Sequence, residues 1–476
     1  MKYISLKNSL KVTVLLISLS VLPACEDFLE IPPPTNSVTG ETVFLNKGTI
    51  DKMMNNRYYN WANSPGVLVQ YSRSAEFFSD NAYNPTGISF YPEMTGVLTP
   101  ETSAMSGGLW GTWYTTVYGA NLILEGLPDA PGITDEAVRN AYMGAALTIR
   151  AGAHYYLART FGDVPINLTA DVDENSFKPR VPVAEVYAQV IADLNEAMTL
   201  LPETGAGDKR YIDNKYIPQA LLARVYTTLG NWAAAETAAN AVIASGKYQL
   251  LTNLADVFYR PSKEVISSLG NIWNNTAYQD RALTGLTFDP NTPTNQNTYP
   301  ALSEDLLNSF ETGDNRKTVW VNLENSGGYS NPNNRYFSIK FLHTSVPVVA
   351  GKEQDYVFIR LAEMYLIRAE ARARQNNLTG ATSDLNVIRN RAGLPNTTAT
   401  SQTDLINAII KERRVELFHE GGYRWDDLVR TGTADAVISA LPWKINWDSY
   451  KTLWPIPLAQ INLNSNLVQN PGYDTE

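Results

Sequence analysis

The stretch PVAEVYAQVIADLNEAMTLLP, residues 182–202, indicates the fold class of this 476-residue chain. Its apolar side chains recur three or four positions apart, which places them on one face of an α-helix. They are Val183, Val186, Tyr187, Val190, Ile191, Leu194 and Met198. Pro202 cannot continue the helix and marks its end. A helix with one apolar face must bury that face against a neighbour, so we expect a fold of packed helices.

Helical periodicity recurs along most of the chain on both sides of this stretch. Before one apolar run, Ser401 and Asp404 form a capping pattern that marks a helix start. The helices that we expect, besides 182–202, are 41–62, 104–127, 134–161, 215–229, 232–246, 301–311, 356–375, 378–392 and 402–419. The sequence therefore predicts a mostly α-helical protein.

Two segments look alike, and each joins two of these helices through a short turn. Residues 221–246 contain Leu-Gly-Asn-Trp followed by Ala235, and residues 369–393 contain Gln-Asn-Asn-Leu followed by Ala381. The first resembles the tetratricopeptide signature, whose helix pairs stack to bury a shared core. Generic helix hairpins are the alternative. In both cases we expect Trp232 to pack in the core or the turn.

Two long regions lack this periodicity and are rich in Asn, Gly, Pro, Ser, Thr and aromatic residues. Only a few short strands are expected there. Loops of this length within a compact chain are usually functional or disordered, so we expect them to form a ligand-binding lobe. The expected layout of residues 41–476 is one intertwined unit: a helix-pair scaffold at 41–62, 104–248 and 356–430, a loop-rich lobe at 63–103 and 249–355, and a C-terminal segment at 431–476.

The N-terminal residues have the features of a signal for export and lipid attachment. Three lysines precede the apolar run VTVLLISLSVL, residues 12–22, which is too short to span a bilayer and suits a signal peptide. The following LPAC resembles a bacterial lipobox, and Cys25 is the sole cysteine of the chain. We expect cleavage after residue 24, acylation of Cys25 and a tether over 25–40; an ordinary secretory signal with a buried cysteine is the alternative. Two or more acyl chains suffice for stable anchoring.

The charge balance argues against nucleic acid as a partner. The formal net charge is −10 and becomes −13 when residues 1–24, which carry three lysines and no acid, are removed. His154, His343 and His419 are far apart in sequence, so no zinc-type cluster is expected. No cofactor is implied; calcium stays open because carboxylates and carbonyls are plentiful in the loops.

Several motifs follow one another along the chain from end to end. They are CEDFLEIPP at the lipobox cysteine, AEFFSDNAY (75–83), IRAGAHYYLARTFGDVPI (149–166), IRLAEMYLIRAEARA (359–373), LNVIRNRAGL (385–394), IIKERRVELFHEGGYRWDDLVR (409–430) and WPIPLAQINLNSNLVQNPGY (454–473). Together they resemble the motifs of the SusD/RagB family of Bacteroidetes outer-membrane nutrient-binding lipoproteins, and the resemblance is weak only across 249–357.

The resemblance implies a function. Family members are surface lipoproteins that cap a SusC-like TonB-dependent transporter, bind oligosaccharides, or peptides in the RagB branch, and deliver them for import. Glu26 and Asp27 look like the surface-export signal of such lipoproteins. Sugar binding needs flat aromatic faces with nearby amides and charges, and no catalytic group. The positions that we expect at the site are Trp273, Asn274, Tyr278, Arg281, Tyr299, Tyr83 and Tyr91; the alternative for each is that it packs its own loop.

The acids of the ERRVEL and RWDDL motifs, within residues 412–430, allow two interpretations. A surface glycosidase would need two carboxyl groups about 5 to 9.5 Å apart. The alternation of acids with arginines instead favours a structural network of ion pairs. We expect Arg150, Arg360 and Arg368 to belong to similar networks. Glycan binding is therefore the leading hypothesis, peptide binding on the same scaffold is the second, and glycosidase activity is the third.

Overall fold

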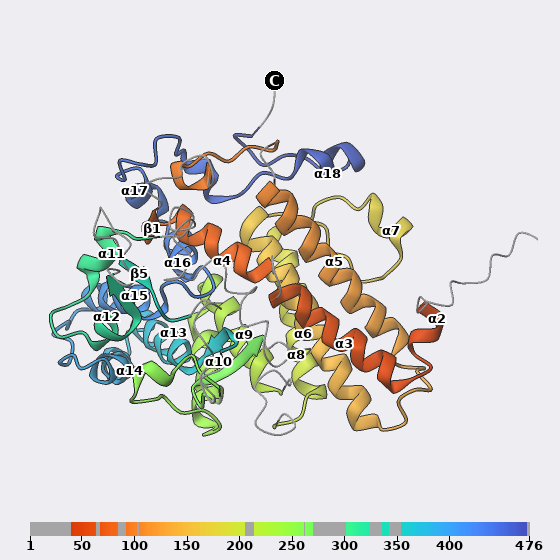
Figure 1. Ribbon diagram of the computed structural model, residues 1–476, viewed down its shortest axis with the longest axis horizontal. Coiled ribbons are helices and arrows are strands. Elements are labelled where there is room, and N and C mark those ends of the chain that lie inside the picture. Colours follow the sequence, from red (N-terminus) through yellow and green to blue (C-terminus); the bar gives the residue numbers. More distant parts are fainter. Residues whose placement is uncertain are drawn as a thin grey trace, which may run out of the picture.

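The computed structural model describes residues 40–62, 67–83, 92–101, 104–204, 214–260, 262–269, 301–323, 336–341 and 354–473. Within this part of the chain nearly every long element is a helix (Figure 1). The mostly α-helical class is therefore confirmed. None of the described helices is both long and apolar enough to cross a membrane.

The scaffold is a series of long helices, each packed against the next. They are α3 (Lys47–Ala62), α5 (Ala104–Gly126), α6 (Glu136–Phe161), α8 (Val183–Leu200), α9 (Tyr216–Thr228), α10 (Trp232–Ala244), α13 (Leu361–Arg374), α14 (Leu378–Arg391) and α15 (Gln402–Leu417). Helix α6 lies between α5 and α8, α9 joins α8 to α10, and α13 contacts α10, α14 and α15. The apolar face of α8 that the sequence indicates is buried against α6, and Val186, Val190 and Leu194 are fully enclosed.

The two similar helix pairs share the same turn. Gly230 and Asn376 both adopt positive φ, 67° and 63°, which reverses the chain after the first helix. The next residues, Asn231 and Asn377, each cap the second helix by accepting a backbone N–H bond with the side-chain oxygen. Trp232 is partly buried against the core, as expected.

One helix lies in a region that we expected to be loop. Helix α4 (Val67–Phe78) falls within the predicted loop region 63–103. Its residues Val67, Leu68, Tyr71, Ala75 and Phe78 are buried at helical spacing in the largest hydrophobic cluster. The Asn-, Gly- and Pro-rich chemistry on both sides concealed this short periodic run. That cluster draws on residues from 67 to 473, and we propose that residues 41–476 form one folding unit on this basis.

The strands are few and form three antiparallel two-stranded sheets. They pair β1 (Ala82–Tyr83) with β3 (Ala301–Leu302), β2 (Val265–Leu269) with β6 (Tyr356–Arg360), and β4 (Val321–Leu323) with β5 (Tyr336–Ser338). The helix expected over 356–375 therefore starts at Leu361. The preceding YVFIR is rich in aromatic and β-branched residues, which favour a strand, and all five of its residues are buried.

The second expected loop region, 249–355, contains two short helices. Helix α11 (Glu304–Ser309) falls within the predicted 301–311 and begins at Ser303, whose hydroxyl accepts the N–H of Leu306 at 3.1 Å. Helix α12 (Asn315–Trp320) lies where no helix was expected. Its last residue, Trp320, is buried in the core.

Short elements complete the described chain and shape its surface. They are α2 (Gly40–Val43), η2 (Pro92–Thr95), α7 (Val172–Ser176), η3 (Leu254–Asp256), α16 (Tyr423–Arg430), α17 (Ala434–Ile438), η5 (Ser449–Thr452) and α18 (Leu458–Leu463). The C-terminal segment that carries α17 and α18 runs across the top of the molecule in Figure 1.

The acids of residues 412–430 form buried ion pairs. Arg413 donates to Asp427 at 2.8 Å, and Glu416 accepts bonds from Arg316 and Arg360 at 3.0 and 2.6 Å. The same holds for the other predicted arginines: Arg150 pairs with Asp193, Arg360 also with Glu420, and Arg368 with Asp384. Acids that are buried and bonded to arginines hold helices together, which is the structural interpretation that the sequence favoured.

Burial of His154 gives a testable pH dependence. Burial is the largest influence and lowers the pKa of His154 to about 4, with the charge of Asp193 opposing it. Between pH 6.5 and 4 the unfolded chain therefore binds a proton that the folded chain does not, so stability falls as the pH falls. We expect the free energy of unfolding to fall by up to about 3 kcal/mol over this pH window. In His154→Gln, the free energy of unfolding measured in urea should fall less steeply between pH 7.5 and 4.5, because one titrating proton no longer contributes to the slope. A slope equal to that of the wild type would refute the assignment to His154.

Candidate functional site

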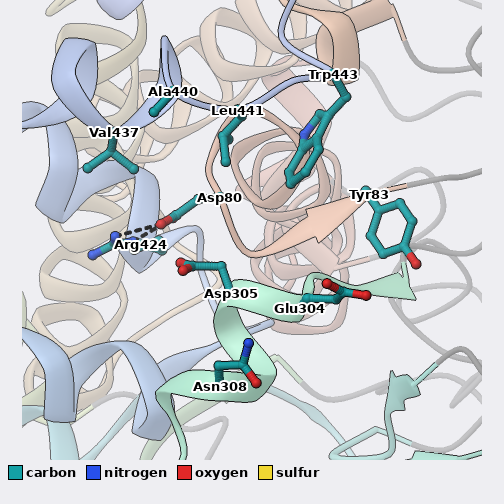
Figure 2. Close-up of a pocket in the computed structure, with 10 residues that line it drawn as sticks. All are labelled: Asp80, Tyr83, Glu304, Asp305, Asn308, Arg424, Val437, Ala440, Leu441 and Trp443. Carbon is teal, nitrogen blue, oxygen red and sulfur yellow. Dashed lines mark hydrogen bonds and ion pairs between the residues drawn. The ribbon is translucent and has the colours of Figure 1, made fainter.

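A pocket of about 790 Å³ opens where β1, α11, α16 and the segment after α17 meet (Figure 2). Its size falls within the range of about 300–1,000 Å³ that is typical of small-molecule sites. The residues that line it are Asp80, Tyr83, Glu304, Asp305, Asn308, Arg424, Val437, Ala440, Leu441 and Trp443. They come from three parts of the sequence that are far apart.

A short strand pair brings the first two of these parts together. Tyr83 on β1 lies opposite Ala301 on β3, in an antiparallel register. The connection continues beyond the strands, because the N–H of Ser303 donates to the carbonyl of Asn81 at 2.9 Å. Ser303 is also the cap of α11, so the start of that helix is fixed beside the Ser-Asp-Asn segment.

Two aromatic rings line one side of the pocket. The ring centroids of Tyr83 and Trp443 are 6.1 Å apart with an interplanar angle of 34°. Both side chains pack on the small apolar cluster of Phe77, Ala82 and Met94. Within the described residues, the indole Nε1 of Trp443 is buried and has no hydrogen-bond acceptor. The pair thus offers apolar ring surface to the pocket.

An ion pair faces these rings across the pocket, as Figure 2 shows. Arg424 donates from Nε and Nη2 to the two carboxylate oxygens of Asp80, both at 2.7 Å, and Arg414 lies 3.1 Å from the same carboxylate. Burial alone would raise the pKa of Asp80, but the Arg424 bonds and the two guanidinium charges outweigh it and lower the pKa. Asp80 is therefore a fixed, ionised partner of two arginines and is unsuited to act as an acid.

The remaining polar wall comes from α11. Glu304, Asp305 and Asn308 are exposed on this helix. Asp305 accepts a bond from Arg414 at 2.6 Å, so the helix is tied to α15. No group of three or more His, Cys, Asp or Glu side chains suited to a metal ion occurs among the described residues. The pocket can hold a ligand between aromatic and polar walls, and the charges of Asp80, Asp305 and Arg424 are already paired.

Of the positions expected at the site, the structure describes Tyr83, which lines this pocket. The others lie outside the described residues: Tyr91, Trp273, Asn274, Tyr278, Arg281 and Tyr299, together with the lipidation candidate Cys25.

Trp443 is a pocket residue that was not among the positions expected at the site. It lies in the same C-terminal segment as Trp447 and Trp454. Trp454 is buried in the core, and Trp447 donates from Nε1 to Asp435 at 2.9 Å. Trp443 alone among the three lines the pocket. Nothing in the local sequence separates these tryptophans, because the pocket depends on where α17 directs the following chain.

Comparisons with known proteins agree over nearly the whole chain. Residues 247–473 match the family described as "SusD family", and residues 27–227 match the one described as "Starch-binding associating with outer membrane". SusD-like protein P38 of Formosa agariphila is 26% identical, with 98% of this chain and 99% of that protein aligned. A SusD superfamily protein of Bacteroides vulgatus superposes with a TM-score of 0.77 at 20% identity, over 90% of this chain and all of the other. A structure described as a laminarin binding SusD-like protein gives a TM-score of 0.71 at 23% identity with the same coverage.

Proposed function

The chain belongs to the SusD/RagB family, and from this premise we propose that it is a cell-surface protein that binds oligosaccharide or polysaccharide without cleaving it. The observation that carries the proposal is the pair of aromatic rings with an unsatisfied indole N–H beside a ligand-sized pocket. The similarity to a laminarin binding protein supports a glycan as the ligand class.

The pocket suits a sugar for two physical reasons. The C–H face of a pyranose ring is apolar and packs on the flat faces of Tyr83 and Trp443, which removes apolar surface from water. Its hydroxyl groups meet the exposed side chains of Asn308 and Glu304, which can exchange hydrogen bonds with water for bonds with the ligand. This arrangement needs neither a metal nor a proton donor.

Further contacts are proposed from the residues that the sequence analysis singled out. Tyr299 is two positions before Ala301, and Ala301 pairs with Tyr83 at the pocket, so we keep Tyr299 among the contacts. We also retain Trp273, Asn274, Tyr278, Arg281 and Tyr91 as candidates. Loss of glycan affinity in Tyr299→Ala, with unchanged unfolding, supports this extension; unaltered affinity removes Tyr299 from the site.

Binding without cleavage is tested by calorimetry together with a reducing-end assay. Oligosaccharides from plant, fungal and host glycans are titrated into the soluble form, residues 26–476. The proposal predicts heat of binding for one class and no new reducing ends after long incubation. New reducing ends made by the wild-type protein would show a glycosidase instead.

We propose acylation at Cys25 and delivery to a SusC-like TonB-dependent transporter as the setting of this binding. The family description "associating with outer membrane" supports a position at that membrane. In Cys25→Ala we expect the protein to move from the outer-membrane fraction to the soluble fraction, since two or more acyl chains are needed for a stable anchor. Retention in the membrane would contradict a lipid anchor at this position. Co-purification of the transporter with the wild-type protein tests the partner.

Peptide binding on the same scaffold is the second candidate, and one observation favours it. Glu304 and Asp305 are exposed carboxylates on the rim of the pocket, which suit a cationic peptide. If no glycan binds, and a lysine-rich peptide binds the wild type but binds Glu304→Gln more weakly, this alternative is established. Failure of such peptides to bind leaves the glycan as the ligand.

A further inference from the structure

A second groove, of about 810 Å³, lies between α5, α7 and α18, and these helices gather at one end of the molecule (Figure 1). It shares no lining residue with the pocket beside Trp443. Its walls come from one face of α5, from the segment that leads into α7, and from the C-terminal segment. The proposed function makes no use of it.

Aromatic side chains form much of this groove. Trp110, Tyr114 and Tyr118 follow one another at four-residue spacing, which aligns them on one face of α5. The rings of Trp110 and Tyr114 lie 5.0 Å apart, and the Tyr114 hydroxyl is held by the carbonyl of Pro165 at 2.9 Å. Tyr118 is 42% exposed, and Phe177 from the other wall is 62% exposed. Two exposed rings, Tyr118 and Phe177, are therefore available to a ligand beside the packed pair of Trp110 and Tyr114.

The polar lining is almost entirely uncharged. Asp173 is the one ionisable acid or base apart from the tyrosines, among seven side chains that carry amides or hydroxyls: Thr115, Asn167, Thr169, Asn175, Ser176, Gln460 and Asn464. Within the described residues, the Oδ1 atoms of Asn167 and Asn175 are buried and have no hydrogen-bond donor. Asn175 is oriented by its Nδ2, which donates to the carbonyl of Thr169 at 2.8 Å. Two acceptors thus lack partners in the wall of the groove.

The contrast with the first pocket identifies the ligand chemistry. That pocket carries four charged side chains, Asp80, Glu304, Asp305 and Arg424, whereas this groove carries one. A ligand with several charges would leave most of them uncompensated, because Asp173 is the one charged side chain in the lining. A neutral chain of hydroxyl-bearing rings matches its exposed aromatic rings and its uncharged amides and hydroxyls.

We infer that this groove is a second binding site for an uncharged segment of glycan. The inference rests on the proposed function, because it assigns the same ligand class to a separate surface. Two sites on one chain engage a long polysaccharide together, so the second contact becomes intramolecular and raises the apparent affinity without a new partner. A short oligosaccharide gains nothing from this effect.

The test uses the double variant Tyr118→Ala/Phe177→Ala, whose side chains are exposed and whose loss leaves the core intact. Val387→Ala, exposed on α14 and outside both sites, is the matched control. With a polysaccharide that retards the wild-type soluble form in a native gel, we expect at least tenfold weaker retention of the double variant and no change in the control. Calorimetry with a short oligosaccharide of the same glycan should give a stoichiometry of two for the wild type and one for the double variant.

The outcomes separate the two claims. If no glycan binds the wild-type protein, the proposed function fails and this inference fails with it. If the wild type binds with a stoichiometry of one, and the double variant is retained equally, the second site alone is overturned. The groove also carries exposed Val172 and Leu463. If the double variant binds glycan normally but no longer co-purifies with the transporter, the groove is a protein-docking surface and the glycan assignment is wrong.

Discussion

Replacing Glu416 with glutamine is expected to lower the free energy of unfolding by about 3–5 kcal/mol, because it breaks a buried ion-pair network by removing one partner. Glu416 is fully buried on α15. Its carboxylate accepts bonds from Arg316 at 3.0 Å and from Arg360 at 2.6 Å, and it also bonds Arg391. A neutral amide would remove the negative charge that compensates these three buried guanidinium groups.

The ionisation of Glu416 shows how tightly it is coupled to these partners. Burial alone would raise the pKa of its carboxyl group, but the charges of Arg391, Arg360 and Arg316 outweigh burial and hold the pKa well below its ordinary value. Because the folded pKa is depressed, this contribution to stability is present above the unfolded pKa of about 4.5 and is lost as the pH falls below it. The expected loss in Glu416→Gln is therefore largest at neutral pH.

A matched exposed pair provides the control for this prediction. Glu203 has a 61% exposed side chain and pairs with Lys215 near the surface. Exposed pairs contribute little because water and salt screen them. The midpoint of urea unfolding at pH 7 should be much lower for Glu416→Gln than for the wild type. For Glu203→Gln it should equal that of the wild type. Equal midpoints for both variants would show that the buried network does not hold the helices together.

Trp443→Ala is expected to weaken glycan binding about 30-fold, which corresponds to about 2 kcal/mol. The substitution removes the larger of the two ring faces in the pocket and the unpaired indole N–H beside it. Tyr83 loses its aromatic neighbour at 6.1 Å as well, so the remaining ring is less well fixed. The measurement is a calorimetric titration with the oligosaccharide that the wild-type protein binds.

Trp443→Phe separates packing from recognition. It keeps a ring against the cluster of Phe77 and Met94 but cannot donate the indole bond. We expect an intermediate affinity and an unfolding midpoint close to that of the wild type. If Trp443→Ala folds normally and binds the glycan as the wild type does, the pocket beside β1 is not the glycan site.

Local patterns predicted the scaffold because helical periodicity depends only on neighbouring residues. The apolar spacing of α8 and the cap at Ser401 are examples, and both are present in the structure. The alternation of acids and arginines along α15 and α16 correctly indicated structural ion pairs. It did not identify their partners: Arg424 of α16 pairs with Asp80, 344 positions away. Such a pairing arises only when α4 and α16 come together.

The same limit applies to the pocket. Tyr83 was found because a motif resemblance pointed to its segment, whereas Trp443 carries no such motif. Its role depends on the path of the chain after α17 and on the pairing of β1 with β3, which are tertiary features. Helix α4 was missed for a local reason, since loop-forming residues on both sides hid a run of twelve helical residues.

The most direct test of the central claim is affinity gel electrophoresis of the soluble form, residues 26–476, against a panel of plant, fungal and host polysaccharides, with reducing ends assayed in parallel. Our account predicts that one polysaccharide class retards the protein and that no reducing ends appear. Unchanged mobility with every polysaccharide, or the release of reducing ends from the one that binds, would contradict a glycan-binding protein that does not cleave its ligand.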